Sequence, residues 1–267
     1  MTVIGYLVTL DGNASSGVSG LIVQRVMRQM VGEIRDVYEA VPGRDGAWLF
    51  PELSGMRNIQ LTCKIVSDSG ANRRAAVRAA ADWMETPDAV QLVVDDEPDR
   101  YYIAKLADAP SPDEMVHRAD FQIGFKAQPY AYALTTSSQS VTAASGVNQT
   151  YTAPDNVSAF PIVEITPVGG NLNGFTLVYN GLYLVYEGVL SSGSTLTISS
   201  LTDTVTEGAN LDTELTGAVD YDSVDMNDVS GDFPVVKPGT NNYSIVPGAG
   251  STNTSTIIVT TWRRRYR

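Results

Sequence analysis

The sequence has 267 residues, of which 43% are hydrophobic and 18% are charged. These values are typical of a globular protein that buries its core in one large domain or two ordinary ones. The formal net charge of −12 argues against nucleic-acid binding over the whole surface, because DNA affinity comes largely from Lys and Arg that displace phosphate counterions. No apolar run approaches the roughly 20 residues of a membrane-spanning helix, so we expect no membrane insertion.

The cysteine content and the first residues bear on where the chain is made. Cys63 is the single cysteine, so no disulfide forms within the chain. Residues 1–10 contain neither a basic segment nor a small-residue cleavage site, so we expect no secretory signal. Both features fit a chain that is made and assembled in a reducing cytoplasm.

Strands are the first predicted elements of residues 1–134. In residues 58–66, apolar and polar side chains alternate, and this period of two predicts a half-buried strand. Further strands are predicted at 90–94, 101–106 and 121–125, with an acidic turn between the first two. We expect five to seven strands in this half.

One helix is predicted in the same half. At residues 71–85 the spacing of apolar side chains changes to intervals of three and four, which is typical of an amphipathic helix. The predicted apolar stripe consists of Val77, Ala80, Ala81 and Met84. We expect Asp68 or Ser69 to cap the start of the helix and Pro87 to follow its end.

The second half differs in composition. Residues 135–148 are uncharged and rich in Ser and Thr, and they are either an inter-domain connection or the exposed first strand after it. No helix is predicted beyond them. Short apolar or alternating runs occur at 161–165, 175–179, 182–186, 195–198, 243–246 and 256–262. Many short strands separated by Gly, Asn, Ser and Pro predict a β-sandwich or jelly roll.

The candidates for catalysis are few. His117 is the only histidine, so a Ser-His-Asp, a Cys-His and most zinc sites would need it. No recognisable motif surrounds it, and we interpret it as a surface or edge residue. Cys63 falls on the apolar face of its predicted strand, where a cysteine acts as a small hydrophobe. We therefore expect no catalytic residue, no metal and no cofactor.

Two acidic groups could bind a cation through carboxylate oxygens. The first consists of Asp95, Asp96, Glu97 and Asp99, which a turn around a proline explains more simply. The second consists of Asp220, Asp222, Asp225 and Asp228. Because the second group lacks the glycine and the terminal glutamate of an EF-hand, we favour a solvated acidic loop.

Basic and aromatic residues in the second half allow other roles. Its five basic residues include Arg263, Arg264, Arg265 and Arg267, whereas it has 12 acidic residues. We expect the arginines to form ion pairs with this acidic body or with another subunit rather than to bind nucleic acid. Three aromatic side chains could stack on sugar rings or could form the sandwich core. They are Tyr183, Tyr186 and Trp262.

Short motifs occur in order along nearly the whole chain. They are GRDGAWLF at 43–50, RNI at 57–59, ADWM at 81–84, DEPDRYYIAK at 96–105, FQIGF at 121–125, PYAY at 129–132, SGDFP at 230–234, KPGTN at 237–241 and WRRRY at 262–266. Together they resemble the distal tail protein family of long, flexible-tailed (siphovirus-type) bacteriophages. Residues 12–20 and 188–217 match no part of that pattern.

The resemblance implies a mainly β protein with one helix. Residues 1–134 would be a ring-forming β domain with a packed α-helix, and residues 135–267 would be a galectin-like β-sandwich. Such proteins form a homohexameric ring that joins the tail tube protein to the tail-tip hub protein and can dock receptor-binding or baseplate proteins. The chain would then be a structural virion component, made in the bacterial host cytoplasm. DNA would pass through an acidic lumen without specific binding.

Three other functions stay open. The first is a carbohydrate-binding protein that acts through the C-terminal sandwich. The second is a glycan hydrolase with two acidic residues, although we expect no enzyme. The third is a tail tube protein, against which the presence of a second half argues.

Overall fold

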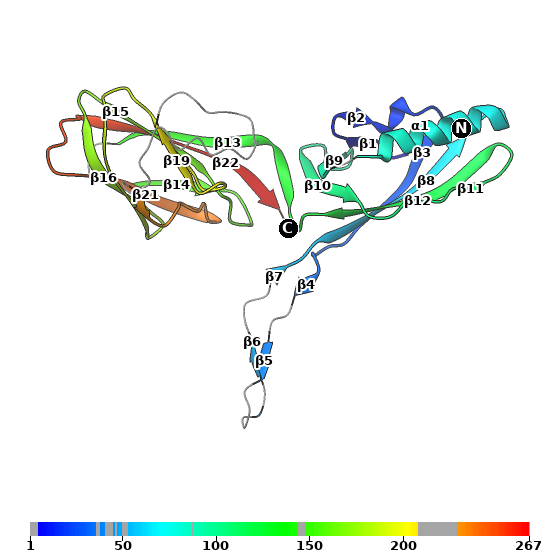
Figure 1. Ribbon diagram of the computed structural model, residues 1–267, viewed down its shortest axis with the longest axis horizontal. Coiled ribbons are helices and arrows are strands. Elements are labelled where there is room, and N and C mark those ends of the chain that lie inside the picture. Colours follow the sequence, from blue (N-terminus) through cyan, green and yellow to red (C-terminus); the bar gives the residue numbers. More distant parts are fainter. Residues whose placement is uncertain are drawn as a thin grey trace. The chain divides into compact units, whose positions relative to one another are not determined.

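The computed structural model describes residues 5–35, 38–40, 45, 47–49, 53–86, 88–143, 148–207 and 229–266. Strands make up most of this part of the chain, together with one α-helix, α1 (Gly70–Met84), and a short 3-10 helix, η1 (Ser15–Gly17). The predicted class, mainly β with one helix, is confirmed. The chain divides into two compact units, residues 1–134 and residues 135–266 (Figure 1).

The first unit is built on an antiparallel sheet. Its strands outside the arm described below are β1 (Val8–Leu10), β2 (Asn13–Ala14), β3 (Leu21–Arg28), β8 (Arg57–Val66), β9 (Val90–Val94), β10 (Arg100–Leu106), β11 (Asp113–Glu114) and β12 (Arg118–Ala127). The central pairs are β3 with β8, β8 with β12, and β12 with β10. The predicted alternation in β8 is confirmed, because Ile59, Leu61, Cys63 and Ile65 are all fully buried.

Helix α1 packs against β8 and β12. Its start is capped by Ser69, whose Oγ accepts a hydrogen bond from the backbone N of Asn72 at 3.2 Å, as predicted. The buried positions are Ala76, Ala80 and Met84. They are spaced by four residues, so they form one line along the helix. The placement of Ala81 in the apolar stripe was wrong, because Ala81 is exposed beside this line. Pro87 lies outside the described residues.

A long hairpin continues β3 and β8 away from their paired segment. Its described strands are β4 (Ile34–Arg35), β5 (Tyr38–Ala40), β6 (Ala47–Leu49) and β7 (Leu53–Ser54). We call residues 29–56 the arm. The pairs Arg28 with Ile59 and Ala40 with Ala47 belong to one antiparallel register, with a local shift of one residue between them.

The expected count of five to seven strands was too low. The structure describes twelve strands, β1–β12, before residue 131. Several of them have only two or three residues. A segment that short carries no readable alternation, so sequence patterns do not reveal it.

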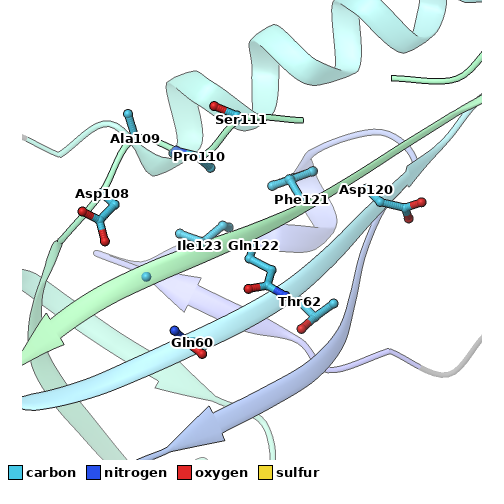
Figure 2. Close-up of a pocket in the computed structure, with 11 residues that line it drawn as sticks. Gln60, Thr62, Asp108, Ala109, Pro110, Ser111, Asp120, Phe121, Gln122 and Ile123 are labelled. Atoms are coloured by element: carbon cyan, nitrogen blue, oxygen red, sulfur yellow. The ribbon is translucent and has the colours of Figure 1, made fainter. Parts of the chain in front are cut away.

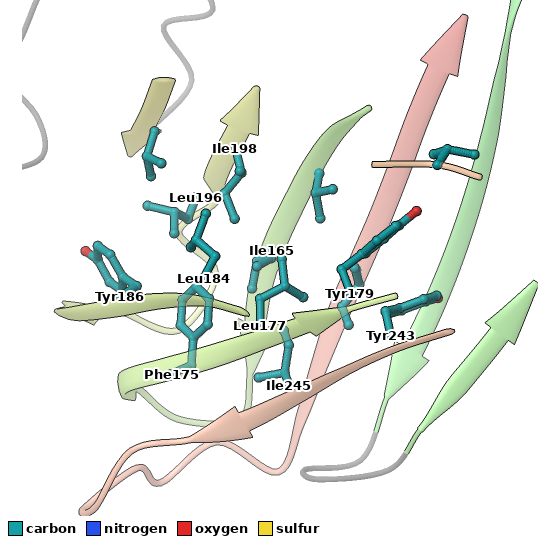
Figure 3. Packing of buried hydrophobic residues seen from close by; sticks show 14 of the residues in the cluster. Ile165, Phe175, Leu177, Tyr179, Leu184, Tyr186, Leu196, Ile198, Tyr243 and Ile245 are labelled. Carbon is teal, nitrogen blue, oxygen red and sulfur yellow. The ribbon is translucent and has the colours of Figure 1, made fainter. Parts of the chain in front are cut away.

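The second unit is a β-sandwich, as predicted. One sheet has the order β19–β18–β15–β22–β13, and the other has the order β14–β21–β16–β17–β20. The strands are β13 (Ala131–Ala143), β14 (Gln149–Ala153), β15 (Ile162–Val168), β16 (Leu172–Tyr179), β17 (Leu182–Leu190), β18 (Leu196–Ser199), β19 (Thr204–Glu207), β20 (Val229–Gly231), β21 (Gly239–Pro247) and β22 (Ser255–Tyr266). Buried side chains from both sheets form one hydrophobic cluster (Figure 3).

Strand β13 carries the chain from one unit into the next. Tyr132 and Ala133 pair with β10 in the first unit, and residues 135–143 continue the same strand in the second. Of the two interpretations for residues 135–148, the exposed strand is therefore right for 135–143. Residues 144–147 lie outside the described part of the chain.

Candidate functional site

The two candidates for nucleophilic catalysis differ in burial. His117 is exposed just before β12, and its backbone oxygen accepts a hydrogen bond from the backbone N of Ser67 at 3.1 Å. Cys63 is fully buried, and burial raises the pKa of its thiol to about 12. Because the thiolate is the nucleophile, this cysteine is not activated at neutral pH.

A shallow polar groove of about 580 Å³ lies on the first unit (Figure 2). Its polar lining comes from β8, β12 and the segment 108–111, and consists of Gln60, Thr62, Asp108, Ser111, Asp120 and Gln122. Asp120 is already paired with Arg118 at 2.5 Å. The lining holds amides, hydroxyls and carboxylates, and no histidine, cysteine or lysine.

The acidic turn between β9 and β10 forms ion pairs with arginines. Both carboxylate oxygens of Asp96 accept hydrogen bonds from the guanidinium of Arg28, at 2.5 and 2.8 Å. These bonds hold the pKa of Asp96 below its usual value. Glu97 Oε1 lies 3.4 Å from Arg100 Nη1, and Asp99 Oδ2 lies 3.6 Å from Arg100 Nε. Within the described residues, no cluster of three or more His, Cys, Asp or Glu could hold a metal ion.

The second acidic group cannot be placed. Asp220, Asp222, Asp225 and Asp228 all lie outside the described residues. The same holds for most of the GRDGAWLF motif, of which the structure describes residues 45 and 47–49.

The root of the arm brings together charged and apolar side chains that the sequence did not single out. Arg57 is buried, with its guanidinium 5.8 Å from the ring centroid of Tyr102, and it donates a hydrogen bond to the backbone oxygen of Met30 at 3.3 Å. Four large apolar side chains of the arm are exposed, with Met30 at 90%. They are Met30, Val31, Ile34 and Met56, and we call them the root patch.

The basic C-terminal strand is tied to the sandwich. Asp155 is buried, and its Oδ1 accepts a hydrogen bond from Arg264 Nε at 2.8 Å. Its Oδ2 accepts another from Trp262 Nε1, also at 2.8 Å. Arg265 donates to the backbone oxygen of Ser158. The predicted ion pairing with the acidic body is thus confirmed for Arg264, and Arg267 lies outside the described residues.

The three aromatic candidates separate into two groups. Tyr186 and Trp262 are buried, the first against Phe175 at 5.3 Å and the second against Tyr151 at 5.2 Å between ring centroids. They belong to the sandwich core. Tyr183 on β17 is 58% exposed, so it alone of the three can present its ring to a ligand.

No helix in the described part of the chain combines the length and the apolar composition required to span a membrane.

Part of the first unit is similar to a known protein family. Residues 21–127, which include β3, the arm, β8, α1 and β12, match the family of the phage tail protein RIFT-related domain. This match covers the greater part of the first unit and less than half of the whole chain. No curated protein matches the sequence.

A solved structure extends this likeness to the whole chain. The Dit protein of phage SPP1, described as a paradigm of the hub adsorption apparatus in phages that infect Gram-positive bacteria, is 14% identical. The match has a TM-score of 0.72 and covers 99% of this chain and 100% of that one. The resemblance to distal tail proteins is thereby confirmed at the level of the fold. A chain of the phage P2 baseplate, in its activated conformation with Ca, matches with 11% identity, 97% coverage of both chains and a TM-score of 0.44.

Proposed function

We propose that the chain is a structural protein of a phage tail tip. In this function, six copies form a ring that joins the tail tube protein to the tail-tip hub protein. The observation that carries the proposal is the arm with its exposed root patch, within a unit that matches a phage tail domain.

The arm supports self-association on physical grounds. In the described part of the chain, β4 pairs with β7 and β5 with β6, and none of the four pairs with a strand outside the arm. An isolated two-stranded hairpin is marginally stable in water. Large apolar side chains that are exposed close together in the sequence, as in the root patch, are favourable positions for a protein interface. A neighbouring copy would cover both, and head-to-tail contacts of this kind close into a ring.

The two units would have different tasks. The first unit would form the ring around the channel, and the second, a galectin-like sandwich, would stand at the periphery and dock receptor-binding or baseplate proteins. The net charge of −12 supports a channel through which DNA passes without adhering, because phosphates would find few cations there. The chain would act without catalysis or cofactor, in the virion tail tip, after synthesis in the host cytoplasm.

Solution mass tests the ring. We expect a species of about 170 kDa, six times the 28.6 kDa chain, because a permanent ring buries on the order of 2,000 Å² or more per contact. The double variant Met30→Ser with Ile34→Ser should give smaller species. Met115→Ser with Val116→Ser is the matched control, since these side chains are also exposed but lie outside the arm. A monomer at every concentration tested would contradict the ring.

A second candidate function is carbohydrate binding by the sandwich. The exposed ring of Tyr183 favours it, because an aromatic face can stack on a sugar ring. Asp232 lies beside it, with its backbone N donating to the oxygen of Tyr183 at 2.8 Å. A glycan array with the full chain should then show binding that Tyr183→Ala abolishes and Tyr183→Phe keeps. No binding to any glycan on the array would reject this function.

A further inference from the structure

The root of the arm is held by contacts from a distant part of the sequence. Arg28 ends β3 and Arg57 begins β8, so the two arginines mark the points where the two arm strands leave the sheet. Both side chains reach residues of the β9–β10 region, Arg28 through Asp96 and Arg57 through Tyr102. The arm therefore depends on a segment about 40 to 70 residues away along the chain for its fixation.

The contact of Arg28 with Asp96 is geometrically specific. Two nitrogens of one guanidinium donate to two oxygens of one carboxylate, at 2.8 and 2.5 Å. Such a two-point pair restricts rotation as well as distance. Only 19% of the Arg28 side chain and 37% of the Asp96 side chain are exposed, so water and salt screen this pair less than they screen a fully exposed one.

The contact of Arg57 complements it on the other strand. Its guanidinium lies over the ring of Tyr102, and it donates to the backbone oxygen of Met30, which belongs to the opposite strand of the arm. The hydroxyl of Tyr102 in turn donates to Glu97 at 3.4 Å, in the same turn as Asp96. The two strands of the root are thus connected to each other and to one acidic turn.

We propose that Arg28, Arg57 and the β9–β10 turn form a lock that holds the root of the arm in one conformation before the chain meets its partner. The lock lies next to the root patch, since Met30 takes part in both. Ordering the patch in advance lowers the entropy lost on association. As far as the partner is a second copy of this chain, the inference rests on the proposed ring.

Pulsed electron paramagnetic resonance can measure the conformational spread of the arm. Spin labels are attached to Asp45→Cys in the arm and Ala79→Cys on α1, both exposed positions. Cys63 stays unlabelled because it is buried. An excess of unlabelled chain restricts the measured distances to single chains. We expect a narrow distance distribution in this background.

Asp96→Asn is the test variant, and Asp99→Asn is its control in the same turn. Asp96→Asn should broaden the distribution and should speed amide exchange in residues 29–35 and 53–56 by roughly three- to tenfold, because local opening no longer breaks the two-point pair. Asp99→Asn should leave both unchanged, since the Asp99 side chain is 68% exposed and its contact with Arg100 is long. Equal widths in wild type and Asp96→Asn, or equal broadening in both variants, would overturn the lock.

A charge exchange keeps the proposal testable if Asp96→Asn does not fold. Arg28→Asp with Asp96→Arg restores an ion pair in the opposite direction, and it should give a narrower distribution than Arg28→Asp alone. No difference between these two would also overturn the lock. The mass of each variant is measured in parallel. If the chain is monomeric and Asp96→Asn broadens the distance distribution, the lock is supported and the ring is rejected. If the chain forms a hexamer and Asp96→Asn leaves the distance distribution unchanged, the ring is supported and the lock is rejected.

Discussion

Replacement of Asp155 by alanine should strongly destabilise the second unit. The carboxylate is buried and accepts two hydrogen bonds, from Trp262 Nε1 and Arg264 Nε. Asp155→Ala leaves the indole N–H without its acceptor in the core and leaves the guanidinium without its counter-charge. Both groups keep their desolvation cost after losing the bond that offsets it.

The expected loss of unfolding free energy follows from these two hydrogen bonds. Each hydrogen bond to a charged group contributes about 1.5–3 kcal/mol. The side chain of Arg264 is 31% exposed, so water compensates for part of the hydrogen bond that Arg264 loses. The contribution of this bond therefore lies near the low end of that range. We expect Asp155→Ala to cost about 3 kcal/mol, which lowers the midpoint of thermal unfolding of a unit of this size by roughly 10 °C. Asp155→Asn should cost less, since its amide oxygen still accepts from Trp262.

Urea unfolding followed by tryptophan fluorescence is the assay, because Trp262 lies at the altered site. The two units can unfold separately, so the transition that shifts is assigned to the second unit by far-ultraviolet circular dichroism and limited proteolysis. Trp262→Phe removes one of the two bonds and serves as the comparison, with its unfolding followed by circular dichroism because the substitution also removes the fluorophore. If Asp155→Ala and Asp155→Asn shift the midpoint equally, or if both cost under 1 kcal/mol, the contribution assigned to these bonds is wrong.

Three further predictions concern the first unit. Cys63 should react with a thiol reagent at pH 8 only as fast as the protein unfolds, because its pKa is raised to about 12 by burial; rapid labelling of the folded chain would contradict this. Ser69→Ala should lower stability by about 1 kcal/mol in urea unfolding through loss of the helix cap, whereas Ser111→Ala should have little effect. The pKa of Asp96 is lowered in the folded chain, so its pair with Arg28 stabilises the fold above the unfolded pKa of about 3.9, and this contribution is lost as the pH falls through the folded value. The difference in unfolding free energy between wild type and Asp96→Asn should therefore be largest at pH 6 and should shrink as the pH falls below about 3.9. A difference that does not change with pH would refute this reasoning.

The sequence predicted the elements whose periodicity is long and uninterrupted. Strand β8 has ten residues with strict alternation, and β12 follows the same pattern, so their buried faces could be read directly. The start of α1 could be predicted because a serine cap is a local feature. The error at Ala81 arose because alanine fits both an apolar stripe and an exposed helix face.

The features that matter most for the candidate site could not be predicted in this way. The strands of the arm have two or three residues each, too few to show a period. Arg28 and Asp96 are 68 residues apart, and nothing local in the sequence indicates that they meet. Asp155 and Arg264 are 109 residues apart. The sequence predicted that the C-terminal arginines pair with the acidic body or with another subunit, but only the fold determines that Asp155 is the partner of Arg264.

The shared register of β3, β8 and the arm limits how the arm can change in evolution. Adding one residue to each strand beyond Ala40 and before Ala47 lengthens the hairpin by a rung and leaves every earlier pair in place. A single residue inserted within β4 would instead turn the side chains that follow it to the opposite face, unless a bulge absorbs it. Related chains should therefore differ in the length of this hairpin far more readily than in the pairing of β4 with β7. The far end of the hairpin would thus vary in length among related chains, whereas the pairing at its near end would stay constant.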